Sequence, residues 1–500
     1  MKKKLVCLQL IFLFIIGFML PSFAQNDAEI TKEVEKYAQQ VMTDWGIPGM
    51  GLGIIKDGKT IYLKGLGLKA VDMQAPVDEN TSFQIASVSK SFTAAIISML
   101  ADEGKLKWDD PVIKHLPDFK LYDKWATENL QIRDIMTHRT GLPEQSLTYI
   151  SKLGYMRKDT YHILQLIEPA SSPRTTYAYN NATFVIAEQL IERLTGKTWE
   201  ENIQERIFNP LGMHSSTYNG DGFLAATNAA HPHGMSYKDG KITSSRIQGE
   251  NRALEWLTGL GPAGSIVSTA NDMLKWIDFH LHNKVADGKP LISKENFDFL
   301  HYGQTIIRQD STRTSIYGQC WFMEQNNRYR MIFHTGTARG FTALCAMVPE
   351  LDLGTIILVN SSTPSESRYA IMRRLVDLYL NDGVMTNYNK EALDTYKKDR
   401  EKPRSERTAP PFVPALKLDE YVDIYTNTPI LGDIEIKLTN DALNITIGSK
   451  RITKPMSHVS GNRFQFSNDG STFNVTFSDD YNGKITGLTV GDELPAWSKK

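Results

Sequence analysis

The chain has 500 residues, with an apolar fraction of 41%, a charged fraction of 23% and a formal net charge of −1. This length predicts two or more domains, or one large domain with an appendage. The nearly neutral charge and the scattered basic residues argue against a nucleic-acid-binding protein, so we expect no nucleic-acid partner.

The first 24 residues predict an export signal (residues 1–24). Three lysines at positions 2–4 precede an almost wholly apolar run over 5–20, and a small-x-small cleavage pattern follows at 22–24. The apolar run is slightly short for a membrane span, which favours cleavage over retention as an anchor. We therefore expect a periplasmic or secreted protein with no stable membrane span after signal cleavage.

Residues 25–385 have the pattern of one α+β domain. An apolar stripe at helical spacing over 26–46 predicts a helix, and Asp57-Gly58 between two apolar runs predicts a β-hairpin. Short connections between the later strands favour antiparallel pairing, in a sheet that joins both ends of the domain. The other expected elements, in chain order, are a helix from Ser87, helices over 160–168 and 182–194, strands at Arg330–His334, Phe341–Val348 and Gly354–Val359, and a helix at Ser367–Leu380.

Two segments, 386–412 and 413–500, differ from the rest of the chain in composition and in the pattern of their apolar residues. The first segment is dense in charge and contains three prolines, which predicts a linker with some helix. In the second segment, apolar residues alternate along short runs, and turn signals such as Asn468-Asp469-Gly470 separate these runs. This pattern predicts a small all-β barrel.

The stretch Ser87-Val88-Ser89-Lys90 opens the helix that is expected after the hairpin. Residues three apart share a helix face, so we expect Lys90 beside the Ser87 hydroxyl. A partly desolvated lysine is neutral often enough to accept the serine proton, which would make the serine a nucleophile. Alone, however, a Ser-x-x-Lys match is a weak signal, because a solvated serine and lysine at a helix start give the same pattern.

Three further motifs favour a catalytic role for Ser87 and Lys90 over a chance match. They are Arg133–Pro143 (RDIMTHRTGLP), Tyr177–Asn181 (YAYNN) and Phe333–Phe341 (FHTGTARGF). Together with the Ser87 stretch, these motifs resemble those of the serine β-lactamase and penicillin-binding-protein superfamily, in its AmpC-like branch of esterases, D-aminopeptidases and D,D-peptidases. The family pattern of Ser-x-x-Lys, Tyr-x-Asn and Lys/His-x-Gly is matched in order by Ser87/Lys90, Tyr179/Asn181 and His334/Gly336.

The resemblance covers about residues 30–380. The stretches 137–143 and 263–272 are similar to scaffold motifs of the family, and 413–500 resembles the lipocalin-like β domain often appended to this branch. The resemblance implies a β-lactamase-like fold, with an antiparallel sheet flanked by helices and a helical subdomain.

The resemblance also implies an acyl-enzyme mechanism. Ser87 would attack a carbonyl group, and Lys90 and Tyr179 would share the proton transfers. A phenol normally titrates near about 10, so Tyr179 would need a nearby cation such as Lys90 to act as a base near neutral pH.

Four more residues receive substrate-binding roles from the resemblance. Asn181 would hydrogen-bond Lys90 or the substrate amide, and Gly336 would let the substrate backbone approach the strand edge. The backbone N–H groups of Ser87 and Thr337 would form the oxyanion hole. His334 stands where true β-lactamases have a lysine that helps hold a carboxylate; because histidine is only partly charged near pH 7, we expect weaker carboxylate anchoring.

The sequence therefore predicts an exported serine hydrolase that acts on small amides, D-amino-acid peptides or esters, without cofactor or metal. The alternatives are a β-lactamase or D,D-carboxypeptidase, and a non-catalytic cell-wall or ligand binding protein. The expected partner is a small-molecule or short peptide substrate, and the oligomeric state stays open. For Cys320 and Cys345, two buried free thiols are expected over a disulfide.

Overall fold

The computed structural model describes residues 26–500 except 219, 249–258, 260, 286–287, 402–415, 469, 481 and 492–493. The predicted export signal lies outside the described residues.

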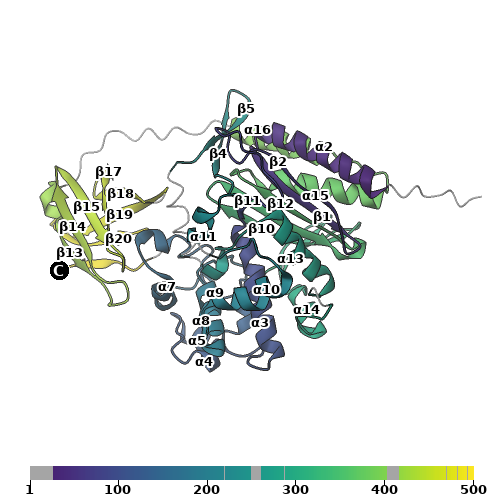
Figure 1. Cartoon of the computed structure of the whole chain (residues 1–500). Coiled ribbons are helices and arrows are strands. Elements are labelled where there is room, and N and C mark those ends of the chain that lie inside the picture. Colours follow the sequence, from purple (N-terminus) through teal and green to yellow (C-terminus); the bar gives the residue numbers. More distant parts are fainter. Residues whose placement is uncertain are drawn as a thin grey trace, which may run out of the picture.

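An eight-stranded antiparallel sheet forms the centre of the larger part of the molecule (Figure 1). The predicted β1–β2 hairpin is confirmed, and at its turn Asp57 and Gly58 have φ values of 50° and 68°, which two-residue hairpins favour. The strands lie in the spatial order β2 (Lys59–Gly67), β1 (Gly49–Lys56), β12 (Leu353–Val359), β11 (Phe341–Val348), β10 (Arg330–Ala338), β9 (Phe322–Gln325), β8 (Thr314–Tyr317) and β7 (Thr305–Gln309). The sheet thus joins both ends of the domain, as predicted.

Helices cover both faces of this sheet. On one face lie α2 (Asp27–Trp45) and α15 (Ser365–Leu380), whose apolar sides share a core with the strands. On the other face lies α13 (Ala270–His282), and beyond it the buried helix α3 (Ser89–Asp102) (Figure 1). The smaller helices of this side are α4 (Val112–His115), α5 (Lys124–Asn129), α6 (Ile132–Met136), α7 (Arg157–Ile163), α8 (Phe184–Thr195), α9 (Trp199–Ile203), α10 (Asn209–Leu211), α11 (Gly220–Ala225) and α14 (Lys294–Leu300).

The expected elements are present with shifted ends. Helices α7 and α8 occupy the regions expected at 160–168 and 182–194, and β10 extends four residues beyond the strand expected at 330–334. The short strands β7 to β9 were not expected, because partner strands rather than an alternating apolar pattern hold them in the sheet. Two short pairs complete the set: β3 (Phe83–Gln84) with β6 (Val267–Ser268), and β4 (His233–Lys238) with β5 (Lys241–Arg246).

Helix α16 (Tyr388–Glu401) corrects part of the predicted linker over 386–412. It packs against α2 and α15, and the buried Asn389 accepts a hydrogen bond from Trp45 Nε1 at 2.8 Å. Residues 388–401 therefore belong to the first domain. Packing against α2 and α15 holds this helix in place, although its sequence is rich in charged residues. Residues 402–412 of the predicted linker lie outside the described residues.

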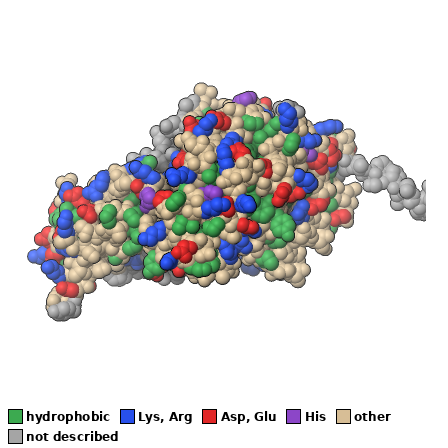
Figure 2. All heavy atoms as spheres, turned by 90° about the horizontal axis from the view of Figure 1, so that it is seen from below, with side chains coloured by type: hydrophobic (Ala, Val, Ile, Leu, Met, Phe, Trp, Pro, Cys, Tyr) green, Lys and Arg blue, Asp and Glu red, His purple; other side chains and the backbone are tan. Residues whose placement is uncertain are grey.

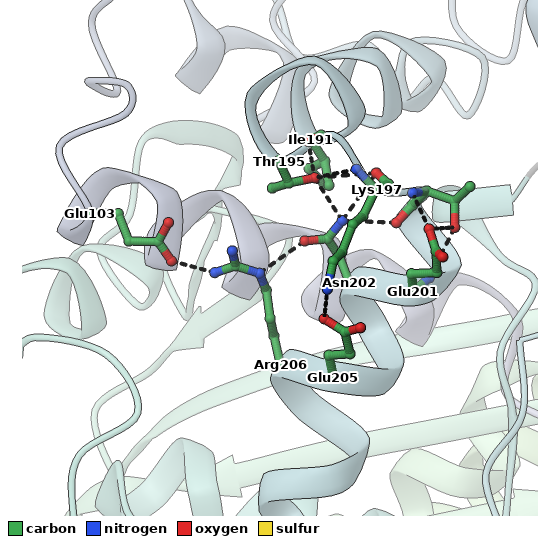
Figure 3. Close-up of polar contacts among 9 residues, drawn as sticks. Glu103, Ile191, Thr195, Lys197, Glu201, Asn202, Glu205 and Arg206 are labelled. Atoms are coloured by element: carbon green, nitrogen blue, oxygen red, sulfur yellow. Dashed lines mark hydrogen bonds and ion pairs between the residues drawn. The ribbon is translucent and has the colours of Figure 1, made fainter.

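A hydrogen-bond network joins the helices of the α3 side (Figure 3). Asn202 on α9 donates to Thr195 Oγ1 at 3.0 Å and to the carbonyl groups of Lys197 and Thr198 at 3.2 and 2.8 Å. Its Oδ1 accepts from Arg206 Nε at 2.9 Å, and Arg206 continues to Glu103 at the end of α3. The network closes the turn after α8, where Gly196 has a left-handed φ of 69° and ends the helix as expected.

Residues 416–500 form a nearly closed, nine-stranded antiparallel barrel, which confirms the predicted all-β unit. Its interior is aromatic and apolar, with Tyr421, Tyr425, Phe464 and Trp497 almost fully buried. The strand order is β16 (Ile452–Pro455), β15 (Ala442–Ile447), β14 (Ile434–Thr439), β13 (Asp423–Thr426), β21 (Trp497–Lys499), β20 (Ile485–Val490), β19 (Ser471–Asp479), β18 (Arg463–Asn468) and β17 (Ser457–Ser460).

In the space-filling view, charged side chains of both signs are interspersed over the surface (Figure 2). Within the described residues, no helix has the length and apolar character that a membrane span needs. Cys320 and Cys345 are buried free thiols, which confirms the expectation that they are unpaired.

Candidate active site

Ser87 lies in a 3₁₀ turn (Ala86–Val88) that leads directly into α3. Ala86 has a φ of 45°, a left-handed conformation that strains a residue with a Cβ. Packing holds this strained turn in place, because its neighbours Ala86 and Val88 are buried while Ser87 is only half-buried. The turn therefore presents the Ser87 hydroxyl to a cavity at the start of α3.

Lys90 lies one helical turn after Ser87, as the spacing predicts. Its Nζ donates to Ser87 Oγ at 3.1 Å, to Asn181 Oδ1 at 2.6 Å and to the Ala263 carbonyl at 2.8 Å. All three acceptors are uncharged, and the side chain is fully buried. Burial therefore lowers the pKa of Lys90 to about 7, so that a large share of this lysine is neutral near neutral pH.

Tyr179 lies beside the same ammonium group. Lys90 Nζ is 4.8 Å from the centroid of the Tyr179 ring. Burial raises the pKa of Tyr179 above its usual value, and the hydrogen bond with Ser87 opposes this only in part. Tyr179 is therefore a protonated phenol that can pass a proton on, while Lys90 is the group that can accept one. These pKa shifts favour Lys90 over Tyr179 as the base, and the proton-transfer roles expected for the two residues stay a prediction.

Asn181 contacts Lys90, which was one of its two expected roles. Its Nδ2 donates to Gln145 Oε1 at 3.1 Å and to Thr148 Oγ1 at 3.3 Å, and these bonds fix the amide orientation. The oxygen is thereby turned toward Lys90. Asn181 links the lysine to the segment that begins at Gln145.

His138 holds the strand-like segment that carries Tyr179 and Asn181. Its Nδ1 accepts from the Asn180 N–H at 3.1 Å, and its ring packs 4.2 Å from that of Tyr179. The ring is buried, and burial, with the nearby Lys90, places its pKa well below the usual value. This neutral histidine positions the segment.

His334 on β10 is neutral. Its Nδ1 lies 2.7 Å from the Thr335 carbonyl and its Nε2 lies 3.0 Å from the Tyr317 hydroxyl. Burial, with the nearby Lys90, lowers the pKa of His334 to about 3, which corrects the expectation of a partial charge near pH 7. His334 therefore offers no positive charge to a substrate carboxylate.

Gly336 has a structural role in addition to the one expected for it. A Cβ at this position would lie 2.0 Å from the Ile85 carbonyl oxygen, so the glycine lets β10 pass close to the turn that carries Ser87. The expected approach of substrate backbone at this position stays a prediction. Thr337, the next residue, is exposed and lines the cavity.

The cavity in front of Ser87 has a volume of about 320 Å³. Among the described residues that line it, none is an acid, a lysine or an arginine, and the histidine there, His334, is neutral. The lining residues are Ala86, Ser87, Gln145, Thr148, Tyr149, Tyr179, Asn181, Ala263, Gly264, Phe322, His334, Thr335 and Thr337. Such a cavity suits an uncharged acyl group.

Sequence reasoning missed the residues that line the wall opposite β10. Gln145, Thr148 and Tyr149 follow the motif 133–143, but they carry no pattern of their own, and Gln145 has a left-handed φ of 58°. The Ala263 carbonyl was missed as well, although its stretch was recognised as a scaffold motif. Among the described residues, no cluster of three or more histidine, cysteine, aspartate or glutamate side chains could hold a metal ion.

Comparison with known proteins places the chain in a family. A family model described as Beta-lactamase matches residues 34–379. The chain is 28% identical over 377 residues to "Unguisins hydrolase ungD'" of Aspergillus campestris, covering 73% of this chain and 68% of that protein. The chain spans about two thirds of the length of the curated relatives it matches.

Two solved structures share the fold. The octameric penicillin-binding protein homologue from Pyrococcus abyssi has a TM-score of 0.62 at 21% identity, covering 94% of this chain and 100% of that one. The D-alanine carboxypeptidase AmpC from Burkholderia cenocepacia has a TM-score of 0.54 at 22% identity, covering 70% and 99%. The first of these similarities extends over the barrel as well as the larger domain.

Proposed function

From the premise that this chain belongs to the beta-lactamase family, we propose that it hydrolyses small amides, D-amino-acid peptides or esters through a Ser87 acyl-enzyme. The coarser parts of this statement, the β-lactamase-like fold with its C-terminal barrel and the serine-hydrolase class, are confirmed by the family match and by the relatives named hydrolase and carboxypeptidase.

The observation that carries the proposal is the environment of Lys90. Neutral Lys90 accepts the Ser87 proton across 3.1 Å as Oγ attacks the substrate carbonyl carbon. Tyr179 passes its proton to the leaving group as the carbonyl–leaving-group bond breaks, and Lys90 hands the Ser87 proton to Tyr179, so the acyl group stays on Ser87 and Lys90 is neutral again. A water molecule then attacks this ester and gives up its proton to Lys90. That proton passes to Ser87 Oγ as the acyl–Oγ bond breaks, which releases the acid and the free serine.

The uncharged cavity favours substrates without a carboxylate next to the scissile bond. β-Lactams and D,D-carboxypeptidase substrates carry such a carboxylate, and the neutral His334 gives it no counter-charge. The β-lactamase and D,D-carboxypeptidase alternatives are therefore placed second. An intact pair of Ser87 and Lys90 in hydrogen-bond contact likewise favours an enzyme over a non-catalytic binding protein.

The test is intact-mass spectrometry of the protein treated with a fluorophosphonate and, separately, with a penicillin. We expect one fluorophosphonate adduct on the wild type and none on Ser87→Ala. Ser91→Ala is the matched control, since Ser91 is a buried serine on the same helix whose hydroxyl donates to the Val88 carbonyl at 2.7 Å. A wild type that neither reagent labels would contradict the proposal, and a long-lived penicillin adduct would favour the D,D-carboxypeptidase alternative.

The export signal predicted for residues 1–24 supports the further proposal that the protein acts in the periplasm or outside the cell. Expression with the full N-terminus in a bacterial host, followed by mass analysis of the exported fraction, should give a chain that begins near residue 25. A full-length chain retained in the cytoplasm would contradict it.

A further inference from the structure

One segment of the chain serves both the active site and the barrel. In residues 145–155, called the wall segment below, Gln145, Thr148 and Tyr149 line the cavity in front of Ser87. The same segment continues through a 3₁₀ turn (Ile150–Leu153) to residues that contact the barrel. It ends just before α7, which lies beside the barrel (Figure 1).

The turn between β18 and β19 binds Lys152 at two points. Lys152 Nζ donates to Ser471 Oγ at 2.9 Å, and Asn468 Nδ2 donates to the Lys152 carbonyl at 2.6 Å. Both the side chain and the backbone of this residue are therefore fixed by the barrel.

The turn between β15 and β16 holds the next residues of the wall segment. The Gly154 carbonyl accepts from the Lys450 N–H at 2.9 Å and from Ser449 Oγ at 3.1 Å. Tyr155 is almost fully buried, and its hydroxyl donates to the Leu431 carbonyl at 2.9 Å. Three barrel connections, β18–β19, β15–β16 and β13–β14, thus contact the end of the wall segment, while its start is bound to Asn181 within the catalytic domain.

Lys152 also reaches the cavity rim. Its Nζ lies 5.2 Å from the centroid of the Tyr149 ring, within the range of a cation–π contact. Tyr149 is 51% exposed at the mouth of the cavity. The contacts thus run from Ser471 through Lys152 to Tyr149.

The same barrel turn also approaches the opposite side of the site. A side chain added at Gly470 would lie 2.8 Å from Arg339 Nη1, at the turn that follows Thr337 on β10. The β18–β19 turn therefore stands near both the wall segment and the end of β10, which border the cavity from two sides.

We propose that the barrel determines which acyl groups the cavity accepts, because its β18–β19 turn, acting through Lys152, holds Tyr149 at the rim. Lys152 and Ser471 are positioning residues, and Tyr149 is the residue that contacts the acyl group. The proposal rests on the proposed hydrolase function. A small acyl group that ends short of the rim is insensitive to Tyr149, while a large one must pack against it.

The experiment compares Lys152→Met and Ser471→Ala with the wild type on two p-nitrophenyl esters, an acetate and a 4-phenylbutyrate. Loss of an exposed cation–π contact should raise KM for the large ester about two- to five-fold, with kcat and the acetate kinetics unchanged. Ser467→Ala is the matched control: its hydroxyl lies in the same hairpin and contacts Thr472 Oγ1 at 3.1 Å. Kinetics of the two variants that match those of the control would overturn the proposal.

Hydrogen exchange provides a readout that does not depend on catalysis. We expect faster amide exchange over residues 147–155 in Lys152→Met than in Ser467→Ala, with the α3 amides unchanged. If the wild type hydrolyses neither ester and no fluorophosphonate labels Ser87, the hydrolase function fails, and the exchange result alone decides whether the barrel holds the wall segment. Unchanged exchange there would overturn the proposal independently.

Discussion

The protonation state of Lys90 determines whether Ser87 can be activated as a nucleophile, and burial determines that protonation state. Its three hydrogen-bond acceptors are uncharged oxygens, so no carboxylate among them offsets the cost of desolvating the ammonium group. The pKa falls to about 7. His334 illustrates the same effect, since burial keeps it neutral and removes the charge that its sequence position suggests.

The pH dependence of kcat/KM should follow from this pKa. Lys90 must be neutral to accept a proton, so kcat/KM should fall as the pH drops below about 7 and should reach a plateau above it. In Asn181→Asp, a carboxylate would replace the amide oxygen 2.6 Å from Nζ and favour the charged lysine. The acidic limb should then move upward by about 1–3 pH units. An acidic limb that stays in place in this variant would contradict Lys90 as the base.

At the scale of elements, the helices around the site are joined by side-chain hydrogen bonds at their ends. The connection between α8 and α9 is short and turns at Gly196, and the Asn202 amide donates to the carbonyl groups of Lys197 and Thr198 in this connection. Asn202 is almost fully buried, and through Arg206 it reaches the end of α3, the helix that carries Lys90 in its first turn (Figure 3). The network thus fixes the helix that carries the base.

Asn202→Ala should lower the free energy of unfolding by about 2–3 kcal/mol, because it removes an almost fully buried amide together with its hydrogen bonds to Thr195, Lys197, Thr198 and Arg206. Lys197→Ala is the control from the same network, since the Lys197–Glu205 ion pair is about half exposed. That change should cost less than about 1 kcal/mol. Urea denaturation followed by circular dichroism measures both, and equal effects in the two variants would contradict the assigned role of Asn202.

At the scale of the whole molecule, the barrel packs on the catalytic domain through close backbone contacts. Gly448 has a φ of 80°, and a Cβ at this position would lie 2.1 Å from the Leu153 carbonyl oxygen. Gly154 opposite also has a left-handed φ, of 84°. Two glycine turns therefore allow the barrel to approach the wall segment more closely than turns with side chains would.

Gly448→Ala should separate the two domains, while Gly483→Ala should not. Gly483 has a nearly equal φ of 78°, but an added Cβ would meet no atom within 4 Å. Both variants therefore carry about the same backbone strain of roughly 1–2 kcal/mol, and the collision with Leu153 is present only in the first. Scanning calorimetry should show two resolved transitions for Gly448→Ala alone, and a single coincident transition in both variants would contradict this interface.

The sequence by itself determined the local features. The spacing of Ser87 and Lys90, the Asp57-Gly58 hairpin and the alternating strands of the barrel depend on residues close in the chain, so short-range geometry predicts them. The order of the motifs was also sufficient to indicate the family and the reaction class.

Only the tertiary structure decided the electrostatics and the shape of the site. The pKa of Lys90 depends on burial and on the Ala263 carbonyl, which is contributed from 173 residues away. The role of Gly336 depends on where β10 passes Ile85, and the place of Tyr149 depends on a barrel more than 300 residues further along the chain. Such contacts join elements that are distant in the sequence, so local sequence patterns do not predict them. Desolvation and packing depend on the assembled core.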